Sequence, residues 1–307
     1  MKTIIAGASL IIVFSFLLSC SASRTTTLPQ NFPSFYKEGH RGARGLAPEN
    51  TIPAMIKGIE AGANVIEVDI YITKDGKVLV AHDPYVNAAY SRWMDGREIS
   101  SADARNYAWR KMNYEDIRKI DVGSKNYQAF PQQEKMKTQM PLFGELIDSV
   151  EVFTKQHNLP GIIYNIELKT SLRFDSLGYN APPAEVVDKV MEVVKSKNIG
   201  NRYYIQSFDR RPLQYVHKKY PGVVIGFLTG SVKETVEENI KALGFIPGIY
   251  SPNYGLVTTE VAEACKKYNM KLVPWTVNTL QEIKRLAGMG VNGIITDYPN
   301  LFEEAGL

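Results

Sequence analysis

The chain has 307 residues, of which 44% are apolar, so it is long enough to bury one large core. A (β/α)8 barrel of about 250 residues would use nearly all of it. The formal charge of +4 comes from 36 basic and 32 acidic residues that are mixed along the chain, so no basic stripe indicates a nucleic-acid partner. We therefore expect one principal domain that does not bind nucleic acid.

The first 20 residues predict an export signal. Lys2 precedes an apolar run from Ile4 to Leu18, which is shorter than the roughly 20 apolar residues that a spanning helix needs. The run leads into LLSC, which resembles the lipobox of bacterial lipoproteins, so we expect lipidation of Cys20, with plain cleavage or a retained anchor as alternatives. Residues 21–35 are rich in Ser, Thr and Pro and predict a flexible tether. The protein is thus expected to be exported and anchored to the bacterial membrane, on the periplasmic face or elsewhere in the envelope.

From residue 36 onward, short apolar runs rich in β-branched and aromatic residues alternate with amphipathic stretches at helical spacing. The predicted strands cover residues 36–42, 64–72, 161–169, 202–208, 223–229, 248–254, 271–277 and 292–298. The predicted helices cover residues 51–62, 142–157, 183–197, 210–220, 232–244, 258–270 and 280–290. This alternation indicates a closed (β/α)8 TIM barrel over residues 36–307, with its chemistry at the carboxyl ends of the strands.

Two segments depart from simple alternation. The turn Lys74-Asp75-Gly76 between alternating apolar runs predicts a β-hairpin, so residues 77–83 should fold back beside the second barrel strand. The hairpin would bring His82 toward the carboxylates of that strand. Residues 85 to about 140 are aromatic, charged and poor in periodicity, which predicts a cap insertion over the strand ends.

A carboxylate cluster is expected at the barrel mouth. Glu67 and Asp69 are two residues apart on one strand, so their side chains point to the same face. Glu167 ends another strand and would aim a further carboxylate at the same place. Carboxylates in a barrel mouth are costly unless a cation lies between them, and oxygen ligands suit one Ca²⁺ or Mg²⁺. A partner arginine would explain the pair Glu67 and Asp69 equally well.

The histidines divide into two groups. His40 ends the first strand and His82 ends the hairpin, whereas His157 and His217 lie on outer helices and are expected to be solvated. Two histidines at one barrel mouth are suited to general acid–base catalysis at neutral pH, although each alone fits a structural role as well. Arg41 and Lys169 would add positive charge that can hold a phosphoryl group.

Several motifs carry a family resemblance. They occur in the order HRG with PENT, EVDIYITKDGKVLVAHDP, NIELK, IQSFD, PWTVN and GIITDYP, from about Gly39 to Asn300. This ordered set resembles the glycerophosphodiester phosphodiesterase family, whose members cleave glycerophosphodiesters to sn-glycerol 3-phosphate and an alcohol. The segment NYEDIRKIDVGSK also resembles the cap that these enzymes insert after the histidine of HDP.

The resemblance implies a role for each site residue. His40 and His82 match the catalytic acid–base pair, and Arg41 and Lys169 match positions that contact phosphate. The divalent metal would be held by residues that match the family's ligands: Glu67, Asp69 and Glu167. The general base would deprotonate either water or the neighbouring glycerol hydroxyl, and the latter route passes through a cyclic phosphate; both routes remain open.

The loop over residues 40–51 combines these functions. Its glycines let the backbone bend close to a ligand. Glu49 is expected to join the metal shell or, preferably, to orient His40 or Arg41 from behind, and Asn50 to cap the first helix or contact substrate. Arg44 is expected to be solvated or to contact the cap.

Aromatic residues offer apolar surface near the site. Phe208 and Trp275 lie at strand ends and would pack against the glycerol carbons, and structural packing is an equally good account of each. The cap aromatics would either close over the alcohol or form the core of the cap: Tyr85, Tyr90, Trp93, Tyr107 and Trp109. Cys265, in a helical pattern, is expected to be an unpaired structural thiol.

Three functions remain in view. The first is hydrolysis of small-molecule glycerophosphodiesters, and the second, in the same fold, is hydrolysis of lysophospholipids or of polymers that carry glycerol phosphate. The third is a barrel without catalysis that only binds an anionic head group. Retention of both mouth histidines and all the carboxylates favours an enzyme.

Overall fold

The computed structural model describes residues 29–30 and 32–307. The predicted signal peptide, most of the predicted tether and Cys20 lie outside the described residues. Among the residues described, no helix has the length and apolar character needed to span a bilayer.

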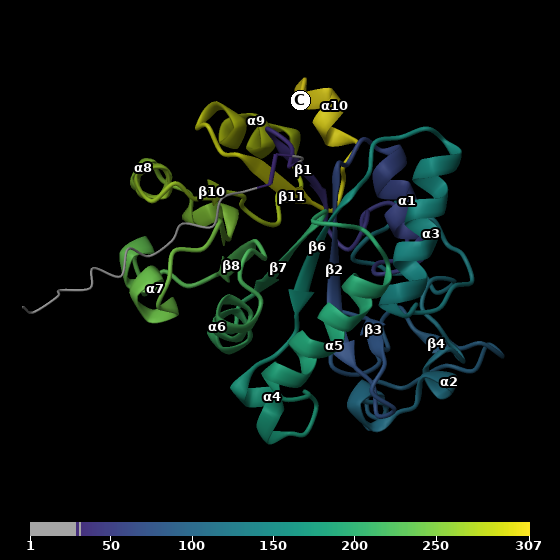
Figure 1. Cartoon of the computed structure of the whole chain (residues 1–307). Helices are drawn as coiled ribbons and strands as arrows, with labels where there is room; N and C mark the ends of the chain where they lie inside the picture. The colour runs from purple at the N-terminus through teal and green to yellow at the C-terminus, as the bar shows by residue number, and fades with distance from the viewer. Residues whose placement is uncertain (1–28, 31) are drawn as a thin grey trace, which may run out of the picture.

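Parallel strands form the barrel that the sequence predicts (Figure 1). In the described part of the chain they follow the order β10-β9-β8-β7-β6-β2-β1-β11. Their bounds are β1 Tyr36–Gly39, β2 Val65–Ile72, β6 Ile163–Leu168, β7 Tyr203–Ser207, β8 Ile225–Thr229, β9 Ile249–Pro252, β10 Lys271–Leu272 and β11 Gly293–Thr296. Backbone hydrogen bonds from Asn292 to Leu272 (2.8 Å) and from Ile295 to Pro274 (2.9 Å) join the last two strands and close the circle.

Strand β10 is shorter than its prediction over residues 271–277. Its ladder covers only Lys271–Leu272. Pro274 follows and has no amide hydrogen to continue a regular ladder. The segment still runs along the barrel wall, because the amide of Val277 donates to the carbonyl of Ile295 at 2.9 Å.

Helices cover the outside of the barrel, as the periodicity predicts. The long ones are α1 Ile52–Glu60, α3 Phe143–Gln156, α5 Pro183–Ser196, α6 Arg210–Lys219, α7 Val236–Leu243, α8 Thr259–Lys267 and α9 Leu280–Gly288. Two short helices were not predicted, α4 Leu172–Ser176 and α10 Leu301–Ala305, because five residues are too few to show a helical period.

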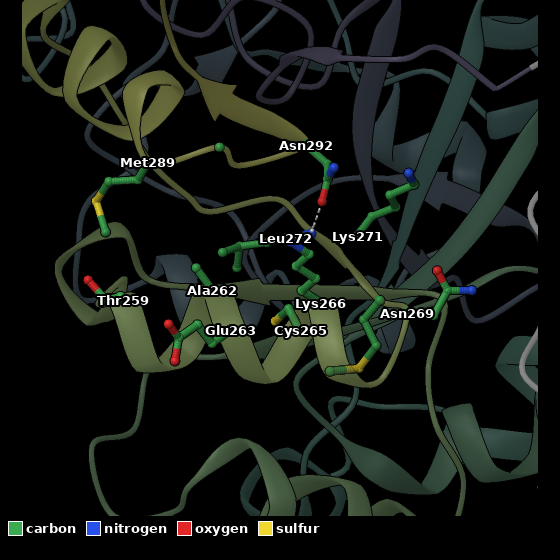
Figure 2. Close-up of a pocket in the computed structure, with 12 residues that line it drawn as sticks. Thr259, Ala262, Glu263, Cys265, Lys266, Asn269, Lys271, Leu272, Met289 and Asn292 are labelled. Atoms are coloured by element: carbon green, nitrogen blue, oxygen red, sulfur yellow. Dashed lines mark hydrogen bonds between the residues drawn. The ribbon is translucent and has the colours of Figure 1, made fainter.

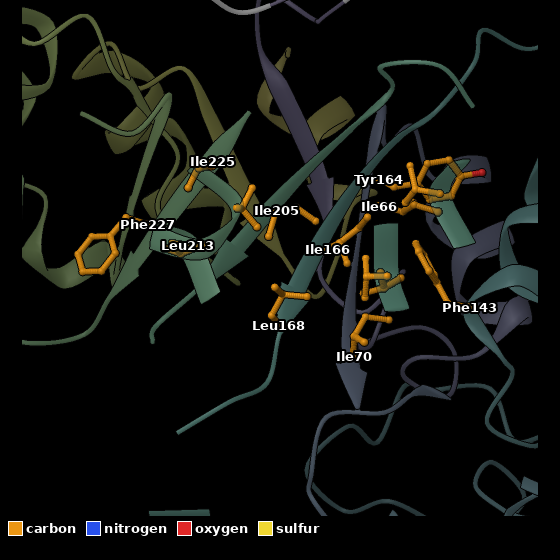
Figure 3. Packing of buried hydrophobic residues seen from close by; sticks show 14 of the residues in the cluster. Ile66, Ile70, Phe143, Tyr164, Ile166, Leu168, Ile205, Leu213, Ile225 and Phe227 are labelled. Atoms are coloured by element: carbon orange, nitrogen blue, oxygen red, sulfur yellow. The ribbon is translucent and has the colours of Figure 1, made fainter. Parts of the chain in front are cut away.

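The apolar core lies in two layers. Outward-facing residues of the strands pack against the helices, and Figure 3 shows Ile66 and Ile166 of the strands beside Phe143 of α3. Inside the barrel, a separate layer closes the end near the strand amino termini: Tyr36, Val65, Ile163, Tyr204, Val224, Ile249, Val273 and Ile295. Because this layer fills the interior from below, a ligand can enter only from the carboxyl ends of the strands.

The predicted hairpin is present. Strand β3 Val78–Val80 pairs antiparallel with β2, and Val80 lies opposite Ile70. The insertion that follows holds β4 Arg92–Trp93, η1 Ala104–Asn106, η2 Trp109–Lys111, α2 Tyr114–Ile117 and β5 Ile120–Asp121.

The insertion has its own hydrophobic cluster. Four of the aromatic residues that the sequence assigned to the cap contribute to that cluster, which identifies them as cap core: Tyr90, Trp93, Tyr107 and Trp109. Tyr85 instead packs edge-on against Tyr179, with ring centroids 5.6 Å apart. Contacts reach from the insertion to the loop over residues 40–51, where the guanidinium carbon of Arg44 lies 4.4 Å from the ring centre of Phe130.

A groove of the described surface lies away from the strand carboxyl ends. Figure 2 shows it beside α8, where Met289 and Asn292 face Cys265 and Lys266 across a volume of about 670 Å³. Cys265 is buried and unpaired among the described residues, as predicted. Burial raises the pKa of its thiol to about 12, so the thiol stays protonated and inert.

Candidate active site

The residues that the sequence analysis singled out converge at the carboxyl ends of the strands. A cavity of about 190 Å³ opens there. It is lined by His40, Arg41, Arg44, Glu67, His82, Glu167, Lys169, Gln206, Phe208, Leu228, Trp275, Thr276 and Ile295. The remaining predicted residues, Asp69, Glu49 and Asn50, lie behind this lining and contact it.

Three buried carboxylates form the centre of the site. Asp69 on β2 pairs in register with Glu167 on β6, and Glu67 lies on the same face two residues earlier. Each residue offers an oxygen, and these oxygens all lie within 4.8 Å of one another. Burial, together with the charges of Asp69 and Glu167, raises the pKa of Glu67 well above its usual value. Glu67 therefore ionises only if a further positive charge, such as a cation, lies beside it.

The donor set fits a divalent cation. Oε1 of Glu67 and Oδ1 of Asp69 are buried and have no hydrogen-bond partner among the described residues. Leaving buried carboxylate oxygens unpaired is costly. Three carboxylates from two adjacent strands are the hard oxygen ligands that Ca²⁺ and Mg²⁺ prefer.

Lys169 and Arg41 balance part of this charge. Nζ of Lys169 lies 2.7 Å from Oε1 of Glu167 and 3.4 Å from Oδ1 of Asp69. Nε of Arg41 lies 3.2 Å from Oδ2 of Asp69. Burial alone would raise the pKa of Asp69, but Lys169 and nearby positive groups hold it well below its usual range. Asp69 is therefore ionised even though it is buried.

A tight loop delivers His40 and Arg41. Gly42 has a φ of +88°, and a Cβ there would lie 2.5 Å from the carbonyl carbon of Ala54. Only glycine fits this approach to helix α1. The amide of Arg41 then donates to Oε2 of Glu67 at 2.8 Å, so backbone as well as side chain ties this loop to the carboxylate cluster.

Glu49 and Asn50 support the site from behind. Glu49 bridges the two arginines of the loop, with its oxygens 2.6 Å from Arg41 and 2.7 Å from Arg44. Asn50 donates to Oδ2 of Asp69 at 2.8 Å and accepts from its amide at 3.2 Å. The expectation that Asn50 caps the first helix is wrong. Thr51 is the cap, because its hydroxyl accepts from the amide of Ala54, which leaves Asn50 free to hold Asp69.

His40 is held by a residue that the sequence analysis missed. Its Nδ1 lies 2.7 Å from Oδ1 of Asp297, which follows β11. Asn278 donates to the other oxygen of Asp297 at 2.6 Å and accepts from its amide at 3.0 Å. Asp297 stands in the motif GIITDYP at the end of a strand, and that position was the available signal. Burial and the charge of Arg41 lower the pKa of His40, so the ring is neutral at pH 7 and its Nε2 is free to accept a proton.

His82 also lines the cavity and is more open. Its Nδ1 lies 3.0 Å from Oδ1 of Asp83, and Asn87 donates to Oδ2 of Asp83 at 2.8 Å. The side chain of His82 is 31% exposed, against 13% for His40. The two mouth histidines thus have matching carboxylate partners but different access to solvent.

An apolar wall faces the charged groups. The rings of Phe208 and Trp275 meet edge to face, with centroids 5.2 Å apart. The indole of Trp275 donates to the carbonyl of Ser251 at 2.9 Å, which fixes its orientation. Gln206 lines the cavity and lies opposite Glu167 in the strand register, and its buried Oε1 has no hydrogen-bond partner in the described structure. This polar group was also missed in the sequence.

A further carboxyl lies deeper in the barrel. Glu38 on β1 is fully buried, and it accepts from the hydroxyl of Tyr204 at 2.5 Å and from Nδ2 of Asn165 at 2.9 Å. Burial raises its pKa to about 7. Glu38 lies opposite Val65 of the apolar layer in the strand register, and its partner Asn165 lies opposite Glu67 of the site. Glu38 therefore lies between the apolar layer and the site.

The outer histidines lie far from this constellation, as predicted. His157 ends α3 and packs against Phe153, with ring centroids 4.2 Å apart. His217 on α6 is exposed and stacks on Phe245, with ring centroids 4.0 Å apart.

Solved structures share the architecture. A protein of Silicibacter pomeroyi, provisionally described as a glycerophosphoryl diester phosphodiesterase, superposes with a TM-score of 0.78 at 27% identity, over 90% of this chain and 96% of its own. A phosphodiesterase of Oleispira antarctica, solved with its product sn-glycerol 3-phosphate, superposes with a TM-score of 0.69 at 20% identity, over 87% and 95%. The protein is therefore a (β/α)8-barrel enzyme.

Sequence comparisons give the family. Residues 40–301 match the glycerophosphoryl diester phosphodiesterase family. A glycerophosphodiester phosphodiesterase of Caldanaerobacter subterraneus is 32% identical over 87% of this chain and 97% of its own length. One of Bacillus altitudinis is 31% identical over 85% and 94%. The chain belongs to the glycerophosphoryl diester phosphodiesterase family and is a phosphoric diester hydrolase.

Proposed function

We propose that the protein hydrolyses small glycerophosphodiesters to sn-glycerol 3-phosphate and an alcohol, with one Ca²⁺ or Mg²⁺ and with His40 and His82 as the acid–base pair. The observation that carries the proposal is the buried carboxylate cluster beside two carboxylate-paired histidines in one cavity. Family membership and the named relatives support the substrate class.

The cation would be held by Glu67, Asp69 and Glu167. When bound, it supplies charge that polarises a phosphoryl oxygen and offsets the repulsion between the carboxylates and the substrate. Oε1 of Glu67 and Oδ1 of Asp69, which accept no hydrogen bond among the described residues, support this assignment.

Two side chains would bind and orient the phosphodiester. Arg41 is fixed by Glu49 and Asp69, and Lys169 by Glu167, so both cations are ordered before substrate arrives. Both line the cavity. A preorganised cation stabilises developing negative charge without having to rearrange during the reaction.

The surroundings of the two histidines support different roles. His40 is neutral and donates from Nδ1 to Asp297, so its Nε2 can act as the general base. It would remove a proton from water or from the adjacent glycerol hydroxyl; the second route gives a cyclic phosphate that is hydrolysed later. His82, oriented by Asp83, would then protonate the departing alkoxide from its Nε2. Phe208 and Trp275 would pack against the glycerol carbons opposite the charged side.

A product assay tests this function. The protein is incubated with glycerophosphocholine, glycerophosphoethanolamine or a lysophospholipid, with and without chelator. Released glycerol 3-phosphate is measured for the two soluble diesters, and released lysophosphatidic acid for the lysophospholipid. We expect turnover of the two soluble diesters that chelation abolishes. Turnover of the lysophospholipid alone would favour the second function, and binding without any turnover would favour a non-catalytic head-group barrel.

We also propose that the protein is exported and held at the membrane by lipid on Cys20. The proposal rests on the order of Lys2, the apolar run and LLSC. Cys20→Ala should move the protein out of the membrane fraction. A variant that still pellets with membranes as fully as the parent would overturn the lipid anchor.

A further inference from the structure

Gln206 is a buried polar side chain of the cavity that the proposed reaction does not use. It lies on β7, is 2% exposed and lines the cavity. Its Oε1 is buried and accepts no hydrogen bond from any described residue. Leaving an acceptor unpaired in the interior is costly, which indicates that a ligand supplies the donor.

The strands on either side of Gln206 do not supply this donor. Glu167 lies opposite Gln206 on β6, and Gly226 lies opposite it on β8. A carboxylate is itself an acceptor, and glycine has no side chain. A Cβ at position 226 would lie 3.2 Å from Cβ of Gln206, which is tighter than ordinary contact. Glycine therefore gives Gln206 its room without giving it a partner.

Other donors that line the cavity are engaged elsewhere. Nζ of Lys169 lies 2.7 Å from Oε1 of Glu167. The guanidinium of Arg41 lies 2.6 Å from Glu49. The indole of Trp275 donates to a backbone carbonyl at 2.9 Å. The donor for Gln206 must therefore enter the cavity with a ligand.

The chemistry of the substrate identifies this donor. An ionised phosphodiester group has only acceptor oxygens, so it cannot donate to Oε1. The glycerol moiety carries hydroxyl groups, each of which has one O–H to donate. Gln206 lies two residues before Phe208, and both side chains line the cavity. The cavity thus offers a glycerol moiety an apolar ring for its carbons and an amide acceptor for a hydroxyl.

We propose that Oε1 of Gln206 accepts a hydrogen bond from a glycerol hydroxyl and thereby selects glycerol phosphodiesters over diesters of simple alcohols. A site built to bond a hydroxyl rejects the analogue that lacks it, because the buried polar group of the site then stays unpaired. The inference rests on the proposed function and adds to it the residue that selects the substrate.

Ligand binding tests the proposal without turnover. The full chain, with Ca²⁺ or Mg²⁺ added, is titrated with sn-glycerol 3-phosphate and with n-propyl phosphate, which has the same carbon chain but no hydroxyl group. We expect the parent to bind glycerol 3-phosphate at least ~10-fold more tightly, because n-propyl phosphate leaves Oε1 unpaired. Equal affinities in the parent would overturn the proposal, and this comparison needs no variant.

Two variants assign the preference to Gln206. Gln206→Met removes the acceptor, keeps the length of the side chain and should reduce the preference at least ~5-fold by weakening the binding of glycerol 3-phosphate. Gln206→Glu keeps an acceptor oxygen and should preserve the preference, even where its charge weakens the binding of both phosphates. Gln214→Met replaces an exposed glutamine on α6 and should change neither affinity.

Three other results would overturn the assignment. An unchanged preference in Gln206→Met would give the hydroxyl to another group. Equal losses for both phosphates would show that Gln206 contacts the phosphate. Ca²⁺ or Mg²⁺ should raise the melting temperature of Gln206→Met as much as that of the parent, and a lost rise would assign the amide to the cation.

The proposed function has its own readout. Turnover of glycerophosphocholine by the parent supports the hydrolysis whatever the variants of Gln206 bind. A parent that prefers glycerol 3-phosphate over n-propyl phosphate but releases none from glycerophosphocholine would overturn the hydrolysis and leave the hydroxyl contact standing.

Discussion

Asp297→Asn removes one charge from the partner of His40 and leaves the shape of the side chain almost unchanged. Nδ2 of Asn278 donates to Oδ2 of Asp297, and Oδ1 of Asn278 accepts from the amide of Asp297, so Asn278 cannot turn over without losing a hydrogen bond. The new amide must therefore place its oxygen toward Asn278 and its NH₂ toward His40. A donor facing Nδ1 drives the ring proton to Nε2, which removes the general base.

The structure sets the size and sign of the effect. A hydrogen bond to a charged group is worth about 1.5–3 kcal/mol, so turnover should fall roughly 10- to 100-fold. Asp297 raises the pKa of His40 against burial and the charge of Arg41, which lower it. Removing that charge lowers the pKa further. The acidic limb of the pH–rate profile should therefore move to lower pH while the plateau falls.

The assay is the pH dependence of glycerol 3-phosphate release from glycerophosphocholine, with circular dichroism to confirm folding. Asp83→Asn serves as the matched variant on His82. A lower plateau with an unmoved acidic limb would mean that Asp297 acts only on structure. Parental turnover and an unchanged profile would refute its role in positioning His40.

Other residues give further tests. His40→Ala and His82→Ala should each lower turnover by at least ~100-fold, since acid–base catalysis typically contributes 10²- to 10⁴-fold; His157→Ala and His217→Ala should stay near the parent, and a near-parental rate in either mouth variant would remove that histidine from the mechanism. The pKa of Glu38 rises from 4.5 to about 7 on folding, so the folded protein holds an extra proton and its stability should fall as pH rises through that range, by on the order of 3 kcal/mol. Glu38→Gln should flatten this dependence in urea unfolding at several pH values, and an unchanged slope would assign it to other groups.

The sequence predicted the barrel and the carboxylate cluster because both follow from local patterns. The two-residue period of strands and the 3.6-residue period of helices can be seen in short stretches of the sequence. Glu67 and Asp69 are two residues apart on one strand, so they share a face whatever the rest of the chain does. Glu167 could be added because the carboxyl ends of parallel strands meet at one edge. The hairpin turn at Lys74-Asp75-Gly76 likewise brought His82 to the mouth.

What the sequence did not predict depends on contacts across the closed barrel. Asp297 reaches His40 only because β11 pairs with β1, at the other end of the chain. Thr51 and not Asn50 caps helix α1, because Asp69 forms hydrogen bonds with both the amide nitrogen and the amide oxygen of the Asn50 side chain. The cap aromatics had no period, so only the fold shows that most of them pack on one another.

The central claim is that the carboxylate cluster works only with a bound divalent cation. Carboxylates at about 4 Å repel each other by on the order of 4 kcal/mol per pair at an effective dielectric constant near 20, and the substrate adds another negative charge. The measurement is glycerol 3-phosphate release by protein freed of metal, before and after addition of Ca²⁺ or Mg²⁺. We predict no release without the ion, recovery with it, and a higher melting temperature that Glu167→Gln diminishes. Full turnover by protein verified to hold no metal would contradict the account and leave the histidines and Arg41 to carry the reaction.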